Sequence, residues 1–213
     1  MLARVFLCTI CSVLIAAPAF AKDKTPTADP SQPVACSGVF GFDSSEALLI
    51  DTYGKDNVVT GQVDGPEGST YLASTVYPGD EERQMIFAWY NEDTRTELSS
   101  VELSPSQSGP GGVRIGMTPA EVQAINEKPF TIGGFWWDYG GYAGFETGKL
   151  AGPLPGECYL SLRFSPADEY SSAIDVTPVT GEVQVPSDEA LLEILDTRVT
   201  KLSIGYALEE ATE

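Results

Sequence analysis

The segment from Gly133 to Phe145 carries six aromatic side chains in thirteen residues, together with two glycine pairs. Glycine permits tight turns and close backbone approach, and Trp and Tyr side chains are enriched where one protein binds another. A rigid aromatic loop at the end of a sheet is therefore suited to contact a protein or a sugar. The segment predicts a binding site formed by Trp136, Asp138, Tyr139 and Tyr142.

The expected burial of these rings follows from the two-residue period of a strand. If a strand continues through the segment, Phe135, Trp137 and Tyr139 share one face and Trp136 lies on the other. We expect Phe135 and Trp137 in the core. The other rings are expected to be partly exposed, unless a partner or another segment covers them.

Asp138 lies among these rings, where a desolvated carboxyl group could act as a general acid. Paired with Glu146 it would supply the two carboxylates that a glycosidase needs. The alternative is a turn aspartate with local hydrogen bonds, which is favoured because carboxylates are common throughout this chain. The sequence therefore predicts no catalytic residue.

The chain has no histidine. This excludes Ser-His-Asp and Cys-His catalysis and metal sites that depend on imidazole. Residues 64–68 offer oxygen donors without the spacing of a calcium loop, and the glycines at 109–112 lack the ending of a phosphate loop. The sequence predicts no metal and no cofactor, and favours a protein that is not an enzyme.

The first residues have the layout of a cleavable secretory signal. Arg4 precedes an apolar run, and small residues flank Phe20 just before Lys22, so residues 1–21 are predicted to be a signal peptide. The apolar run is too short to span a membrane, and no transmembrane segment is expected in the mature chain. We expect an exported protein of the periplasm or the extracellular space.

Two cysteines remain after the signal, Cys36 and Cys158. An even pair in an oxidising compartment favours a disulfide bond. The alternative is a reactive thiol, but neither cysteine has a neighbouring histidine or much positive charge nearby to lower its pKa.

Acidic residues outnumber basic ones by 31 to 12, which gives a formal net charge of −19. Such a chain repels a phosphate backbone, so no nucleic acid is expected as a partner. Residues 22–35 are polar and rich in proline, and predict a disordered leader.

Two short helices are expected, each opened by a hydroxyl side chain and followed ten residues later by lysine. Ser45 and Thr118 are suitable helix caps, and Pro119 suits the first helical position. After each helix come segments with strand-like composition and turn residues between them. The expected strands are 57–63, 70–77, 84–90, 97–104, 130–138, 142–147, 158–164 and 198–206.

The repetition of a capped helix followed by strands predicts an α+β fold of two tandem units, each a short helix packed on a roughly four-stranded antiparallel sheet. The first unit is assigned to residues 36–108 and the second to 109–213. An insert at 165–197 carries a further short helix that begins at Ser187 and ends at Leu195. Residues 104–112 are predicted to link the units.

The residues Arg114-Ile-Gly-Met-Thr-Pro-Ala-Glu-Val122, followed by Lys128-Pro129, resemble a signature of small exported proteins. It is similar to that of the SmpA/OmlA (BamE-like) outer-membrane assembly lipoproteins and of the tandem-repeat β-lactamase inhibitor proteins (BLIP-like). The resemblance covers about fifteen residues and implies a helix that leads into an antiparallel sheet. Glu127 stands where those families usually have glycine, and the lipidated cysteine is missing, so the resemblance implies no membrane anchor.

The sequence favours an exported, non-enzymatic binding or envelope-associated protein. It would present a sheet and the aromatic loop to a protein partner, which we expect to be another exported or envelope protein. The alternative is a glycan-binding or glycan-cleaving protein that uses the aromatic loop and the carboxylates near it.

Overall fold

The computed structural model describes residues 33–208, which form an α+β fold. The predicted signal peptide and residues 22–32 of the predicted leader lie outside this range. The described part contains three α-helices, nine strands and five short 3-10 helices. In chain order these are η1 (Gly38–Phe40), α1 (Glu46–Tyr53), η2 (Lys55–Asn57), β1 (Val58–Asp64), η3 (Pro66–Gly68), β2 (Thr70–Val76), β3 (Met85–Asn91), β4 (Thr96–Glu102), η4 (Pro110–Gly112), α2 (Pro119–Asn126), β5 (Thr131–Gly133), β6 (Ala143–Gly144), β7 (Tyr159–Ser165), η5 (Thr177–Val179), β8 (Gln184–Pro186), α3 (Ala190–Ile194) and β9 (Arg198–Gly205).

The two predicted helix starts are confirmed. The Leu48 amide donates to Ser45 Oγ at the start of α1 (3.2 Å), and the Glu121 amide donates to Thr118 Oγ1 at the start of α2 (3.2 Å). The Glu121 carboxylate accepts in turn from the Thr118 amide, which completes a capping box. Caps of this kind stabilise a helix by about 1 kcal/mol, because they pair amides that the helix itself leaves free.

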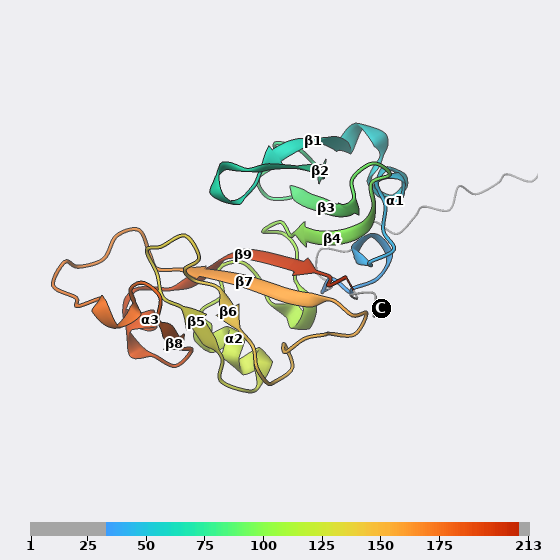
Figure 1. The fold of residues 1–213 in the computed structure, drawn as a ribbon. Helices are drawn as coiled ribbons and strands as arrows, with labels where there is room; N and C mark the ends of the chain where they lie inside the picture. The colour runs from blue at the N-terminus through green and yellow to red at the C-terminus, as the bar shows by residue number, and fades with distance from the viewer. Residues whose placement is uncertain (1–32, 209–213) are drawn as a thin grey trace, which may run out of the picture.

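Six strands form one antiparallel sheet in the order β1-β2-β3-β4-β9-β7 (Figure 1). The first four follow one another in sequence, so consecutive hairpins build that half. The last two come from the predicted second unit, and β9 pairs with the edge of β4. The largely apolar run from Met85 to Tyr90 lies in β3, in the interior of the sheet.

The strands are distributed differently from the prediction of two separate four-stranded sheets. Only β5, β6 and β8 form a second sheet, and β8 lies within the insert. The reason is that β7 and β9 extend the first sheet and leave the short strands of the second unit to pair with the insert. The division into units at 36–108 and 109–213 stays a prediction.

One hydrophobic core runs beneath the six-stranded sheet. Phe87, Val101, Ile204 and Leu160 pair in register across β3, β4, β9 and β7 and are all buried. Leu162 and Phe164 of β7 and Leu202 of β9 are also buried, at every second position from Leu160 and Ile204. The pairing of Val101 with Ile204 therefore joins side chains from both halves of the chain in one apolar layer.

The predicted disulfide bond between Cys36 and Cys158 is confirmed, with Cα atoms 6.0 Å apart. It fixes the beginning of the described chain to the residue just before β7. Nearby, Val34 is buried and its amide donates to the Ser108 carbonyl (2.7 Å), so the packed structure begins before Cys36. In residues 33–208, no helix is both long enough and apolar enough to cross a bilayer.

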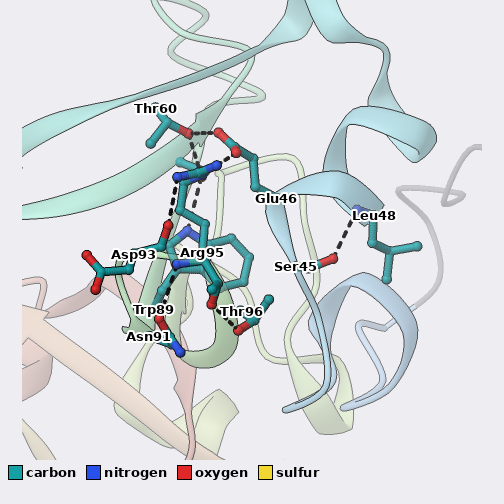
Figure 2. Close-up of polar contacts among 11 residues, drawn as sticks. Ser45, Glu46, Leu48, Thr60, Trp89, Asn91, Asp93, Arg95 and Thr96 are labelled. Carbon is teal, nitrogen blue, oxygen red and sulfur yellow. Dashed lines mark hydrogen bonds and ion pairs between the residues drawn. The ribbon is translucent and has the colours of Figure 1, made fainter.

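A polar network connects α1 to the sheet (Figure 2). The Glu46 carboxylate accepts hydrogen bonds from Thr60 Oγ1 and Arg95 Nε, and forms an ion pair with Arg95. Thr60 Oγ1 lies 2.7 Å from Ser74 Oγ, which also accepts from Trp89 Nε1 (3.0 Å). The network joins α1, β1, β2, β3 and the turn before β4, and its role is to hold the helix against the sheet.

Candidate functional site

The segment 133–145, here called the aromatic tip, runs from the last residue of β5 through β6, beside β7 (Figure 1). Its backbone is held on two sides. The Gly134 amide donates to the Val183 carbonyl (2.8 Å) and the Phe135 amide donates to the Val179 carbonyl (2.8 Å), both in the insert. On the other side, the Phe164 amide donates to the Gly141 carbonyl (2.7 Å). The backbone of the tip is therefore hydrogen-bonded to two supporting segments, the insert and β7.

The glycine pairs are required by this close packing. A Cβ atom on Gly134 would lie 2.4 Å from the Gly181 carbonyl oxygen, and one on Gly141 would lie 2.1 Å from the Phe164 carbonyl oxygen. Gly141 also has a φ of +84°, which favours glycine. The glycines predicted to permit close backbone approach have this role at these two positions.

The strand expected over 130–138 ends at Gly133, and the alternation predicted for the tip does not apply beyond it. Trp136 has a φ of +60°, a conformation that is uncommon for a bulky residue. Backbone strain of this kind concentrates at binding and catalytic sites, where the surrounding structure holds the residue in place. Trp136 lies outside β5, and its side chain is exposed.

The rings of the tip divide into buried and exposed sets. Phe135 is 3% exposed, while Trp136, Tyr139 and Tyr142 are 49%, 54% and 44% exposed. Trp137, which we expected in the core, is only half-buried, and its Nε1 donates to the Gly134 carbonyl (2.8 Å). The four side chains predicted to bind a partner, these three rings and Asp138, are thus accessible on one loop.

A cleft of about 280 Å³, here called the tip cleft, lies between the tip, the end of β7 and the residues that follow β7. Trp136 and Tyr170 line it with ring centroids 5.8 Å apart. Asp168 and Arg163 also line it. The two aromatic rings pack against each other, and with the two groups of opposite charge they give the cleft both apolar area and directional hydrogen-bonding capacity.

Arg163 is held by the backbone of the tip. Its Nε donates to the Gly140 carbonyl (2.9 Å) and its Nη2 to the Asp138 carbonyl (3.3 Å). The guanidinium carbon lies 5.3 Å from the centre of the Tyr142 ring, within the range of a cation–π contact. Within residues 33–208, the Arg163 side chain forms no ion pair with a carboxylate. Its charge therefore remains available to a bound molecule.

Tyr139 connects the tip to the other end of the sheet. Its hydroxyl donates a hydrogen bond to the carboxylate of Glu67, in the turn between β1 and β2. This hydrogen bond raises the pKa of the Tyr139 hydroxyl, because a phenolate would face a carboxylate; slight desolvation and the charge of Asp138 act in the same direction.

The two carboxylates considered for glycosidase chemistry do not enter the tip cleft. Asp138 and Glu146 are exposed, and among the described residues that line the cleft Asp168 is the carboxylate. A glycosidase needs two carboxyl groups about 5 to 10 Å apart across the scissile bond. Asp138 and Glu146 therefore do not form the carboxylate pair of a glycosidase in this cleft.

Sequence reasoning missed four residues of this region: Glu67, Arg163, Asp168 and Tyr170. Arg163 could have been identified from the sequence, because it falls on the polar face of a strand in which apolar and polar residues alternate. Tyr170 and Asp168 lie in the irregular insert, where no period indicates which way a side chain points.

In the described part of the chain, no cluster of three or more acidic or cysteine side chains is arranged to hold a metal ion. Comparisons with family models, with curated proteins and with solved structures found no significant match to the chain. The resemblance to the SmpA/OmlA and β-lactamase inhibitor families stays a prediction.

Proposed function

We propose that the chain is an exported, non-enzymatic binding protein whose aromatic tip contacts a protein partner, itself exported or part of the envelope. The observation that carries the proposal is the exposure of Trp136, Tyr139 and Tyr142 on a loop whose backbone is fixed by two supporting segments. Preorganised aromatic side chains lose little conformational entropy when they are buried by a partner.

The open face of the sheet extends this surface. The backbone of Tyr142 forms an isolated antiparallel β-bridge with Arg163 of β7. Ser161 and Tyr159 lie on the same face of β7 as Arg163, and Tyr159 is 44% exposed. Next to them a hollow of about 390 Å³ is lined by residues of β4, β7 and β9. A partner seated on the tip would therefore meet a continuous surface of serine and tyrosine side chains.

The test uses the tagged, oxidised chain beginning at Lys22 to capture partners from the native envelope. The double variant Trp136→Ala/Tyr142→Ala is expected to lose at least tenfold in recovery of a partner, which corresponds to about 1.4 kcal/mol. The control is Ile194→Ala, which removes an equally exposed apolar side chain from α3. Equal recovery by both variants would argue against the tip as the contact.

A second candidate, glycan binding, is favoured by the tip cleft. Trp136 and Tyr170 offer flat apolar surfaces, and Asp168 and Arg163 offer hydrogen bonds to hydroxyl groups. Asp168→Asn with Tyr170→Ala is expected to abolish glycan binding on an array while leaving protein capture intact. The first proposal is favoured if the wild type binds no glycan on the array and the variant Trp136→Ala/Tyr142→Ala loses protein capture.

A further inference from the structure

Strand β1 forms the free edge of the six-stranded sheet. It pairs with β2 over Val58–Asp64, and Figure 1 shows it at the top of the view, where no other element of residues 33–208 lies beyond it. The opposite edge, β7, is partly covered by the aromatic tip, because the Phe164 amide donates to the Gly141 carbonyl (2.7 Å). An uncovered edge strand is a template for pairing with another chain.

The hydrogen-bond pattern shows which backbone groups of β1 point outward. The Tyr77 amide donates to the Asn57 carbonyl (2.8 Å), so the odd-numbered residues that follow in β1 are hydrogen-bonded to β2. The even-numbered residues therefore point their backbone groups away from β2. The outward groups without a hydrogen bond to a described residue are the amides and carbonyls of Thr60, Gln62 and Asp64 and the carbonyl of Val58.

β1 lacks the features that protect edge strands from association. It runs for seven residues without a lysine or proline, and its register with β2 has no bulge. The Val59 side chain is 54% exposed. A Cβ atom on Gly61 would meet nothing within 4 Å, so the space beside the middle of the strand is open as well.

The outward groups restrict how two copies of β1 can pair. An antiparallel pair uses them when even-numbered residues of the two copies face one another. The two-fold axis of a pair that includes most of the strand then passes through Thr60, Gly61 or Gln62. An axis at Thr60 places Asp64 opposite Asp56 of the second copy, and like charges in this position are destabilising.

An axis at Gln62 is also unfavourable. It places Pro66, which has no amide, opposite the Val58 carbonyl. An axis at Gly61 instead lets the Asp64 amide donate to the Val58 carbonyl of the second copy. The backbone groups therefore favour Gly61 as the centre of the pair.

The side chains of β1 match in the same register. Thr60 of each copy pairs with Gln62 of the other, and Val59 of each copy lies opposite Val63 of the other. The valines occupy non-hydrogen-bonded positions, where the side chains of paired strands lie closest. The pairing therefore buries the exposed Val59 side chain against another apolar side chain.

Charges at the two ends of the strand are complementary in this register. Lys55 lies three residues before β1 and Glu67 lies three residues after it, so each Lys55 comes near Glu67 of the second copy. Lys55 is exposed and forms no ion pair within residues 33–208. The net negative charge of the chain opposes association, but salt screens repulsion beyond about 8 Å at physiological ionic strength.

We propose that β1 pairs with β1 of a second copy of the chain, antiparallel and about Gly61, in a two-fold symmetric dimer. The two six-stranded sheets then form one continuous sheet, and the uncovered edge is removed from solvent. The dimer uses β1 and not the aromatic tip, so it goes beyond the partner proposed for the tip and does not depend on it.

Cross-linking tests the register. In the chain beginning at Lys22 both cysteines are bonded to each other, so one introduced cysteine supplies a single free thiol. In the proposed dimer Gly61→Cys places two thiols within disulfide distance, while Val59→Cys places them roughly 13 Å apart along the strands. We expect mild oxidation to give a covalent dimer of Gly61→Cys and to leave Val59→Cys monomeric. Equal cross-linking of both variants, or no cross-linking of Gly61→Cys, would overturn the proposal.

Sedimentation equilibrium measures the association of the oxidised wild-type chain itself. At about 0.15 M salt we expect a monomer–dimer equilibrium with a Kd of about 100 μM or tighter. Val59→Lys places a lysine on the edge and is expected to weaken the dimer at least tenfold. Ile194→Lys makes the same change of charge at an exposed position of α3 and should leave the Kd unchanged. A wild-type chain that stays monomeric at about 1 mM, or equal weakening by both variants, would overturn the proposal. The wild-type measurement decides the matter even if a variant fails to fold.

Discussion

Val101 of β4 lies directly opposite Ile204 of β9, and both side chains are fully buried. These residues are more than one hundred positions apart in the chain, and their pairing merges the two halves of the sheet. The core beneath the sheet is continuous at this point, so neither half can unfold without exposing the apolar side chains of the other.

We therefore predict one cooperative unfolding transition. Ile204→Ala is expected to lower the stability of the whole protein by about 2 to 5 kcal/mol without splitting the transition. Ile194→Ala makes the same substitution at a position that is 57% exposed, and should change stability by no more than about 0.5 kcal/mol. Differential scanning calorimetry provides the measurement. Two well-separated transitions would contradict a shared core.

The disulfide bond gives a second stability prediction. Cys36 and Cys158 are 122 positions apart, and closing a loop of that order removes enough unfolded-state entropy to stabilise the fold by about 4 to 5 kcal/mol. Thiol labelling of the denatured, unreduced chain beginning at Lys22 should find no free thiol, and reduction should lower the melting temperature sharply. Stoichiometric labelling of both cysteines without reductant would exclude the bond.

The hydrogen bond from Tyr139 to Glu67 is testable through the titration of the phenol. Because Glu67 raises the pKa of Tyr139, Glu67→Gln should bring that pKa back towards the ordinary value of 10.0. NMR of ring-labelled tyrosine follows the change site by site. An unchanged Tyr139 pKa in the variant would show that the turn after β1 and the tip do not interact in solution.

Glu46 predicts how stability depends on acid pH. Burial alone would raise the pKa of its carboxyl group, but hydrogen bonds from Thr60 and Arg95 and the charge of Arg95 lower it below 4.5. A lowered folded-state pKa means that the contribution to stability is present above about pH 4.5 and is lost as the pH falls through the folded-state value.

Glu46→Gln is accordingly expected to destabilise the protein by about 1 to 2 kcal/mol at neutral pH, with a difference from the wild type that shrinks towards pH 3. Urea unfolding at a series of pH values measures this. The control Glu81→Gln removes an exposed carboxylate and should track the wild type at every pH. A difference that stayed constant with pH would assign the effect to packing rather than to charge.

Local signals in the sequence were enough to predict the α+β class, the capped starts of α1 and α2, and the strands that became β1 to β4, β7 and β9. These elements are specified by helix caps, by turn residues and by alternation within a few positions. The merging of the sheets was not predictable in this way, because pairing between β4 and β9 is set by which long-range contacts bury most apolar area.

The aromatic tip shows where local reasoning fails. A two-residue period was assumed as far as Tyr139, but the chain leaves the strand at Gly134, where the carbonyl of Gly181 approaches too closely for any side chain. The backbone that forces this departure belongs to the insert, whose sequence carries no periodic pattern. The exposure of Trp136 thus depends on a contact with residues more than forty positions away.

The last prediction separates binding from stability within the tip. Trp136→Ala and Tyr142→Ala remove exposed rings and are expected to change the free energy of unfolding by no more than about 0.5 kcal/mol. Phe135→Ala removes a neighbouring ring that is 3% exposed, and should cost about 3 to 5 kcal/mol. Chemical unfolding of the three variants gives the comparison on one scale. If Trp136→Ala destabilised the protein as much as Phe135→Ala, the Trp136 ring would be part of the core, and the proposed contact surface would lose its central residue.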